Sequence, residues 1–216
     1  MKKILYILRH GETNENKIGI VQGQGIDSSL NELGLWQASQ FFKKYKNRSF
    51  DQIIASGQKR SYQTIEAFES NHQRIHRDIR INEISWGEHE GKAGEPDLMI
   101  KYYKILDAWK SGDYSASPIS GESASKLYER INEFINDIQA NPYQQILVCT
   151  HGRTLRALVC RLKMLKGKTK LPWCFTVHLW VRMNASSVSL SNIMREHSLH
   201  GFRRFRWSWR QLRIVT

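Results

Sequence analysis

Two blocks of the chain place a histidine followed by a glycine directly after an apolar run. The first is Arg9-His10-Gly11, which follows Ile4-Leu5-Tyr6-Ile7-Leu8. The second is His151-Gly152, which follows Ile146-Leu147-Val148-Cys149-Thr150. An apolar run that stops at a polar residue and glycine is typical of a buried strand ending in a tight loop. If both runs are parallel strands of one sheet, both histidines emerge at its carboxyl edge, where open α/β sheets bind ligands.

The chemistry that such a pair could support is phosphoryl transfer. Histidine can act as a nucleophile, and arginine offers a planar pair of donors that matches phosphate. Attack on phosphorus requires a neutral imidazole with one free ring nitrogen, and a backbone carbonyl that accepts from the other nitrogen would fix the tautomer. The first block taken alone has an alternative interpretation. His10 and Arg9 could be a lone histidine and a solvated arginine at a strand end, without a chemical role.

Further short motifs occur around these blocks in a fixed order. They are Leu8-Arg9-His10-Gly11-Glu12-Thr13 with Asn16, Gln22-Gly23, Leu30-Asn31-Glu32-Leu33-Gly34, the stretch 55–64 with Arg60, the stretch 82–91 with Glu83, Gly121-Glu122-Ser123, and Thr150-His151-Gly152. This ordered set resembles the histidine phosphatase superfamily, also called the phosphoglycerate mutase-like family, over about residues 3 to 190. The resemblance implies a phosphoglycerate mutase-like fold and a mechanism through phosphohistidine.

The resemblance also implies roles for the residues around the phosphate. The first histidine of the family motif becomes phosphorylated, so His10 is the expected nucleophile. Arg9, Arg60 and His151 would form the phosphate pocket. Fixed cationic donors of this kind stabilise the charge that spreads over three equatorial oxygens during transfer. An exposed residue in the first turn of a helix is the alternative for Arg60.

A carboxyl group is needed to protonate the leaving oxygen and later to activate water. Glu83 matches the position of the family's general acid, and Glu88 and Glu90 are nearby competitors. The residues expected on the substrate side are Asn16, Gln22, Gly23, Gly152 and Arg156. A solvent-facing helix position is the alternative for Arg156. No cofactor and no metal are expected, because arginines supply the positive charge that Mg²⁺ supplies elsewhere.

Two departures from the mutase pattern favour the phosphatase branch, and the chain looks closer to α-ribazole phosphatase and fructose-2,6-bisphosphatase-like members. Cofactor-dependent mutases typically carry Glu-Arg-His-Tyr-Gly where this chain has Glu83-Ile84-Ser85-Trp86-Gly87. The insert 91–120 holds lysines but no arginine pair for a second phosphate. The expected function is hydrolysis of a small phosphorylated metabolite. A mutase and a catalytically retired phosphate- or nucleic-acid-binding module are the alternatives, and the chain could act as a monomer or a homodimer.

Length and composition indicate a single globular domain over residues 1–216, with 40% hydrophobic and 25% charged residues. The formal net charge of +13 favours anionic partners. Three cysteines without metal-like spacing indicate thiols in a reducing compartment. The apolar run after Met1-Lys2-Lys3 is too short for a signal peptide, so a cytoplasmic location is expected.

Strands and helices are expected to alternate, which predicts the α/β class as a three-layer α/β/α sandwich with a mostly parallel central sheet. Strands are expected at 3–9, 51–55, 78–81, 145–150, 175–181 and 186–190. Helices are expected at 31–46 with Asn31 as N-cap, 57–69 with Ser56 as cap, 95–110, 122–140 and 153–164.

The segment 195–216 carries six arginines and one acidic residue, with aromatic residues between the arginines. A closing edge strand over residues 211–215, packed on the sheet, is the favoured interpretation. Such a stretch could alternatively bind single-stranded nucleic acid or an anionic membrane surface.

Overall fold

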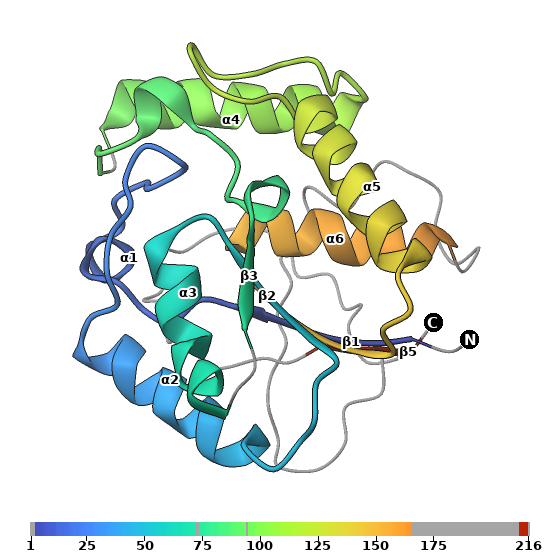
Figure 1. Cartoon of the computed structure of the whole chain (residues 1–216). Coiled ribbons are helices and arrows are strands. Elements are labelled where there is room, and N and C mark those ends of the chain that lie inside the picture. The colour runs from blue at the N-terminus through green and yellow to red at the C-terminus, as the bar shows by residue number, and fades with distance from the viewer. Residues whose placement is uncertain (1–2, 72–73, 94, 166–211, 216) are drawn as a thin grey trace, which may run out of the picture.

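A central sheet of five strands organises the protein, and the computed structural model describes residues 3–71, 74–93, 95–165 and 212–215. Its strand order is β3-β2-β4-β1-β5 (Figure 1). The strands are β1 (Ile4–Arg9), β2 (Gln52–Ser56), β3 (Ile75–Asp78), β4 (Gln145–Thr150) and β5 (Leu212–Val215). The first four run parallel, and β5 pairs antiparallel with β1. The expected α/β class with a mostly parallel sheet is therefore confirmed.

Helices cover both faces of this sheet. They are α1 (Asn14–Ile18), α2 (Glu32–Tyr45), α3 (Lys59–Ile65), α4 (Pro96–Ser111), α5 (Ala124–Ala140) and α6 (Gly152–Leu165). The helices α2 and α3 lie on one side of the sheet, and α5 and α6 lie on the other (Figure 1). As expected, the Asn31 side chain caps α2 by accepting from the backbone N–H of Gly34.

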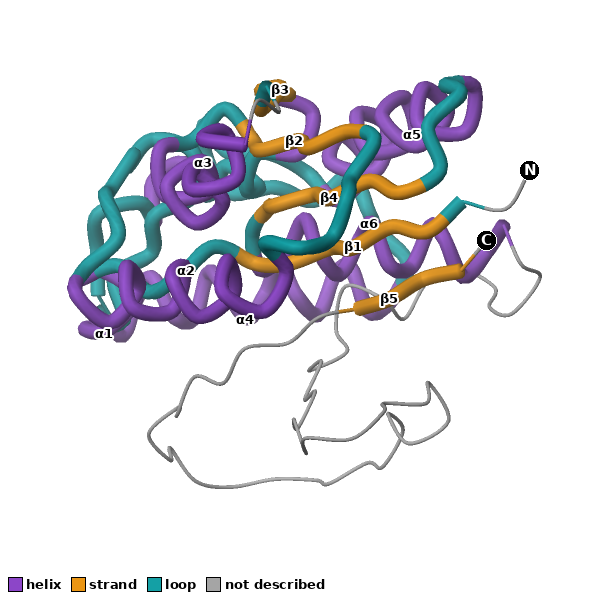
Figure 2. Tube along the Cα trace, turned by 60° about the horizontal axis from the view of Figure 1, so that its bottom comes forward, coloured by secondary structure: helices purple, strands orange, loops and turns teal. Residues whose placement is uncertain are grey.

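The alternation of side chains along β1 explains why two helical layers are needed. Leu5 and Ile7 belong to the buried cluster that includes residues of α5 and α6. Tyr6 and Leu8 belong to a second cluster, which includes residues of α2 and α3. Successive side chains of a strand point to opposite faces, so a strand that is apolar throughout must be covered on both. Figure 2 shows the sheet between the helices.

Two expectations about local structure need correction, and a third concerns residues that the structure does not describe. The third strand is Ile75–Asp78 rather than 78–81, because Asp78 accepts from Arg80 N and the chain turns into a 3-10 helix over Ile79–Ile81. The residue that caps α3 is Gln58 rather than Ser56, and α3 ends at Ile65. The strands expected at 175–181 and 186–190 lie outside the described residues. The edge strand expected near the end of the chain is confirmed as β5.

Candidate active site

The ends of β1 and β4 bring the two histidines together. Arg9 and Thr150 are the last residues of these neighbouring strands and face each other in the register. His10 donates its backbone N–H to the carbonyl oxygen of Thr150 at 2.9 Å. The ring centroids of His10 and His151 lie 5.0 Å apart. Parallel pairing of the two runs therefore places both side chains at the carboxyl edge of the sheet.

The His10 imidazole is held in one tautomer. Its side chain is 7% exposed, and its Nδ1 lies 2.7 Å from the carbonyl oxygen of Gly11. Because a carbonyl oxygen only accepts, Nδ1 carries the hydrogen and Nε2 keeps its lone pair. Burial, together with the charges of Arg9 and Arg60, holds the pKa of His10 well below its usual value. The imidazole is therefore neutral near pH 7, the form that a nucleophile requires.

His151 is completely buried and also neutral. Its Nε2 lies 2.7 Å from the hydroxyl oxygen of Ser56 at the end of β2. Its Nδ1 has no hydrogen-bond partner among the described residues. Burial and the nearby Arg60, His10 and Arg9 hold the pKa of His151 well below its usual value. An anion bound among these cations would oppose their effect and favour protonation of the ring.

Arg60 is a buried residue of α3, so the alternative of an exposed residue in the first turn is wrong. Its side chain is 1% exposed. It donates to the carbonyl oxygens of Ile26 at 2.9 Å and Gly23 at 3.0 Å. Its buried Nε has no partner in the described part of the chain. These two carbonyls fix the plane of the guanidinium group, which leaves an edge for another acceptor.

Arg9 lies within the same electrostatic cluster. Burial lowers the pKa of Arg9 to about 10, and the charges of Arg156 and Arg60 lower it while Glu83 raises it. Arg156, on α6, is only partly exposed, and burial followed by the charge of Arg153 lowers its pKa. Arg156 is therefore not a residue that simply faces solvent, which was the alternative for this position.

The Glu83 carboxylate lies at the start of α6. It accepts from the backbone N–H of Arg153 at 3.1 Å, the backbone N–H of Thr154 at 3.2 Å and the Thr154 hydroxyl at 3.2 Å. A Cβ at Gly152 would lie 3.6 Å from Glu83 Oε2 and 3.7 Å from Arg9 Cζ. Glu83 and the Arg9 guanidinium therefore flank Gly152. The free N–H groups of a helix N-terminus favour a negative charge at this point.

The two competing carboxylates have other partners. Glu88 forms an ion pair with Lys101 at 2.7 Å. Glu90 accepts from the backbone N–H groups of Gln24 at 3.0 Å, Gly25 at 2.7 Å and Trp86 at 2.7 Å. Glu90 thus connects the loop 22–25 to the turn after Glu83. Of the three carboxylates, Glu83 is the one whose surroundings include Arg9.

The residues expected on the substrate side differ in their surroundings. Gly23 supplies the carbonyl that Arg60 and Gln58 bind, so it positions Arg60. Gln22 is buried, and its amide donates to the Thr13 hydroxyl and to Glu15 Oε2. Asn16 lies on α1 and donates its backbone N–H to Thr13 Oγ1. Among the described residues, Gln22 and Asn16 form no hydrogen bond with His10 or His151.

Two residues at the site were missed from the sequence. Ser56 contacts His151, and β2 is the neighbour of β4, so its position at a strand end was a usable signal. Gln58 is 4% exposed. Its amide donates to the Gly23 carbonyl at 2.9 Å and accepts from the backbone N–H of Glu83 at 2.9 Å. Gln58 thus links the loop that holds Arg60 to the segment that holds Glu83.

Among the described residues, no group of three or more His, Cys, Asp or Glu side chains is arranged to hold a metal ion. No helix in the described ranges has the length and apolar character needed to cross a bilayer.

Comparison with known proteins gives a consistent result. A sequence model described as "Histidine phosphatase superfamily (branch 1)" matches residues 5–190. The adenosylcobalamin/alpha-ribazole phosphatase of Escherichia coli is 30% identical over 160 residues, which are 73% of this chain and 78% of that protein. Phosphoserine phosphatase 1 of Hydrogenobacter thermophilus is 29% identical over 160 residues, covering 73% of this chain and 75% of that protein. A mycobacterial glucosyl-3-phosphoglycerate phosphatase, solved with VO3, superposes with a TM-score of 0.65 at 27% identity, covering 76% of this chain and 83% of that one.

Proposed function

The chain belongs to the histidine phosphatase superfamily, and we propose that it hydrolyses small phosphomonoesters through a covalent phosphohistidine on His10. The observation that carries the proposal is the His10 imidazole itself. Its Nδ1 hydrogen is committed to the Gly11 carbonyl at 2.7 Å, so Nε2 is the nucleophilic atom. Relatives with phosphatase names support the same class of reaction.

In the first step, His10 Nε2 attacks phosphorus in line with the leaving oxygen. The new N–P bond forms as the P–O bond to the alcohol breaks, and Glu83 gives its proton to the departing oxygen. Arg9, Arg60 and His151 bind the three equatorial oxygens. Because these donors are fixed before the reaction, they stabilise the transition state without reorganising. The products are the free alcohol and phosphohistidine.

In the second step, water replaces the alcohol. Glu83, now ionised, accepts a proton from the water as the oxygen attacks phosphorus, and the N–P bond breaks. Inorganic phosphate leaves and His10 returns to its neutral form. Glu83 is positioned for both steps because the α6 N–H groups hold its side chain beside the Arg9 guanidinium.

The experiment is to trap the intermediate with 4-nitrophenyl phosphate. An alkaline quench preserves phosphohistidine, and mass spectrometry of the peptide should place one phosphoryl group on His10. His10→Ala should lose turnover by roughly a thousandfold or more and give no phosphopeptide. His76→Ala is the matched control, because His76 lies exposed on β3.

Metal independence is tested in the same assay. Turnover should survive chelation with EDTA, since guanidinium groups supply the charge in the proposed mechanism. Wild-type turnover in H10A, a phosphoryl group on another residue, or loss of activity on chelation that added Mg²⁺ restores would each contradict part of the proposal.

A further inference from the structure

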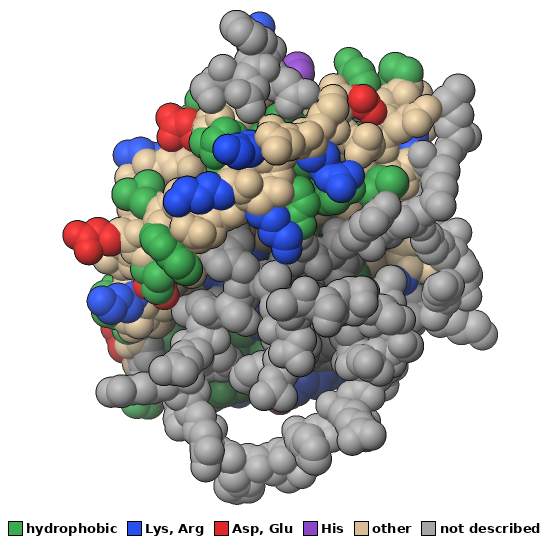
Figure 3. Space-filling view, turned by 90° about the horizontal axis from the view of Figure 1, so that it is seen from below, with side chains coloured by type: hydrophobic (Ala, Val, Ile, Leu, Met, Phe, Trp, Pro, Cys, Tyr) green, Lys and Arg blue, Asp and Glu red, His purple; other side chains and the backbone are tan. Residues whose placement is uncertain are grey.

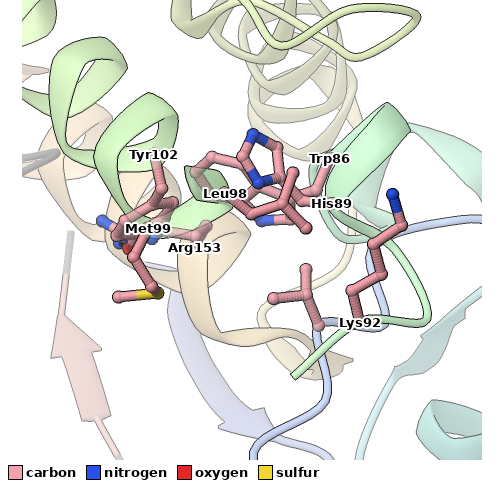
Figure 4. Close-up of a pocket in the computed structure, with 8 residues that line it drawn as sticks. Trp86, His89, Lys92, Leu98, Met99, Tyr102 and Arg153 are labelled. Atoms are coloured by element: carbon pink, nitrogen blue, oxygen red, sulfur yellow. Dashed lines mark hydrogen bonds between the residues drawn. The ribbon is translucent and has the colours of Figure 1, made fainter. Parts of the chain in front are cut away.

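A cavity of about 170 Å³ lies between α4, the start of α6 and the turn that follows Glu83. Its lining residues come from four separate parts of the chain (Figure 4). They are Val21, Trp86, His89, Lys92, Leu98, Met99, Tyr102 and Arg153. His10 and His151 do not line it, so it is distinct from the phosphate pocket.

Arg153 connects this cavity to the proposed chemistry. Its backbone N–H donates to Glu83 Oε1 at 3.1 Å, while its side chain lines the cavity and donates to the Tyr102 hydroxyl. Trp86, another lining residue, follows Glu83 by three positions. The cavity therefore adjoins the segment that holds the proposed general acid.

The walls of the cavity are largely aromatic and apolar. The ring centroids of Trp86 and Tyr102 lie 5.0 Å apart. The Arg153 guanidinium lies 5.7 Å from the Trp86 ring centroid and 5.8 Å from that of Tyr102. Leu98 and Met99 of α4 complete the apolar lining. Such a surface favours an apolar body rather than a fully hydrated sugar.

One polar group in the lining has no hydrogen-bond partner among the described residues. His89 is 3% exposed, and its Nε2 has no hydrogen-bond partner in the part of the chain that the structure describes. A buried polar group without a partner is costly, so a ligand that reached His89 Nε2 would gain by pairing with it. The cationic side chains of Lys92 and Arg153 share this lining. Their charge favours a ligand atom that is an acceptor, most strongly a carboxylate.

We propose that this cavity binds the leaving group of the substrate, and that the group is a ring-sized, partly apolar alcohol bearing an anionic acceptor. The inference rests on the proposed function, because it needs phosphorus at His10 and the departing oxygen at Glu83. The size follows from the volume, since an engineered apolar cavity of about 150 Å³ binds benzene.

The test compares three phosphomonoesters: methyl phosphate, phenyl phosphate and 4-carboxyphenyl phosphate. The wild-type protein should show the highest kcat/KM with 4-carboxyphenyl phosphate and the lowest with methyl phosphate. His89→Phe keeps a ring but removes the nitrogen. It should lower the ratio of kcat/KM for 4-carboxyphenyl over phenyl phosphate by about tenfold. His76→Phe, on exposed β3, should leave that ratio unchanged.

A second variant tests the volume and does not touch the buried histidine. Met99 is half-buried in α4, so Met99→Trp should fill the cavity and raise KM for phenyl phosphate. The ratio of kcat/KM for phenyl over methyl phosphate should fall by about tenfold. Ile100→Trp is the matched control, because Ile100 is 55% exposed on the same helix.

The outcomes separate the two proposals. If both variants keep the wild-type ratios while methyl phosphate is still hydrolysed through phosphohistidine, the cavity is not the leaving-group site and the proposed function stands. If the wild-type protein hydrolyses none of the three esters and forms no phosphohistidine, the proposed function itself is wrong.

Discussion

The balance of charge among single side chains indicates what the site binds. The charge of Glu83 acts on the pKa values of Arg9, Arg60 and Arg156. The carboxylates of Asp27, Glu15 and Glu90 also act on Arg60. Burial lowers the pKa of Arg9 to about 10, which still leaves this guanidinium protonated near pH 7. The imidazole of His10 is neutral, and the charges that act on it are those of Arg9 and Arg60, so positive charge is in excess around this buried ring. A phosphate dianion would offset that excess.

The role of Glu83 can be tested through the leaving group. Glu83→Gln keeps an oxygen that accepts from the α6 N–H groups but cannot give a proton. We expect kcat/KM for phenyl phosphate to fall about a hundredfold or more, because phenoxide needs protonation as it leaves. The loss of kcat/KM with 4-nitrophenyl phosphate should be much smaller, since 4-nitrophenolate is a stable anion. The kcat values should fall with both esters, because hydrolysis of phosphohistidine also uses Glu83.

Steady-state kinetics with both esters measures this difference. The control is Glu88→Gln, which alters the partly exposed carboxylate paired with Lys101. Equal losses of kcat/KM with the two esters would argue that Glu83 positions the site and gives no proton to the leaving group.

At the level of elements, the site depends on contacts between three loops. The Gly23 carbonyl accepts from Arg60 and from Gln58, and the Gln58 amide in turn binds the backbone of Glu83. The Glu90 carboxylate binds the loop after Gly23 and the turn at Trp86. Arg60 and Glu83 are therefore held in place by the same hydrogen-bond network, although they do not bond to each other within it.

A pair of glycine variants tests this network. Gly23 has a φ of +51°, and a Cβ there would lie 1.8 Å from Glu90 Oε1. Gly19 has a φ of +80° with nothing within 4 Å of its Cβ position. Gly19→Ala should cost about 1 kcal/mol from backbone strain alone. Gly23→Ala should cost about 2–4 kcal/mol, because Glu90 must also move.

Urea unfolding and the 4-nitrophenyl phosphate assay measure both effects. G23A should also lose activity, because the shifted loop no longer fixes Arg60. Equal destabilisation of the two variants, with full activity in G23A, would show that the Glu90 contact has no part in positioning the site.

The buried strands are the elements that the sequence predicts best. The runs before His10 and His151 are apolar throughout, which marks β1 and β4 as buried strands and places both histidines correctly. The third strand was expected at 78–81 but lies at Ile75–Asp78, and Ile79, which follows it, is 72% exposed. In α2, the apolar residues Leu35 and Trp36 are 52% and 57% exposed. Periodicity does not show which apolar residues a neighbouring element will cover.

The site residues that directly follow strand ends could be predicted from the sequence. Those that depend on hydrogen bonds to distant loops were harder to predict. Arg60 could not be assigned to the interior from composition, because its burial depends on the carbonyls of Ile26 and Gly23, which are distant in sequence. Gln58 was missed for the same reason. Its two hydrogen bonds reach residues 35 and 25 positions away, and no local pattern contains such contacts.

Over the whole molecule, the net charge of +13 favours approach of anions, and basic side chains lie among hydrophobic ones on the face in Figure 3. Within the buried site, by contrast, the two imidazole rings must stay uncharged. Burial and nearby arginines hold the pKa values of both His10 and His151 well below the ordinary value. The cost of keeping these rings neutral among cations must appear in the pH dependence of global stability.

The sign of that dependence follows from proton binding. In the unfolded chain both histidines titrate near a pKa of about 6.5. As the pH falls below this value, the unfolded state binds protons that the folded state does not, so the free energy of unfolding decreases. Between pH 6.5 and pH 5, the loss should reach up to about 2 kcal/mol for each histidine.

Urea unfolding at pH 7.5 and pH 5.0, in a buffer without phosphate, measures the loss. The double variant H10Q/H151Q should lose less stability over this interval than the wild-type protein, because neither glutamine titrates. His76→Gln, at an exposed position of β3, is the matched control. If H10Q/H151Q and H76Q lose stability equally, the buried imidazoles are not the source of the acid sensitivity. Adding phosphate at pH 5.0 should restore stability in the wild-type protein, since a bound anion stabilises the folded state and offsets the cationic cluster.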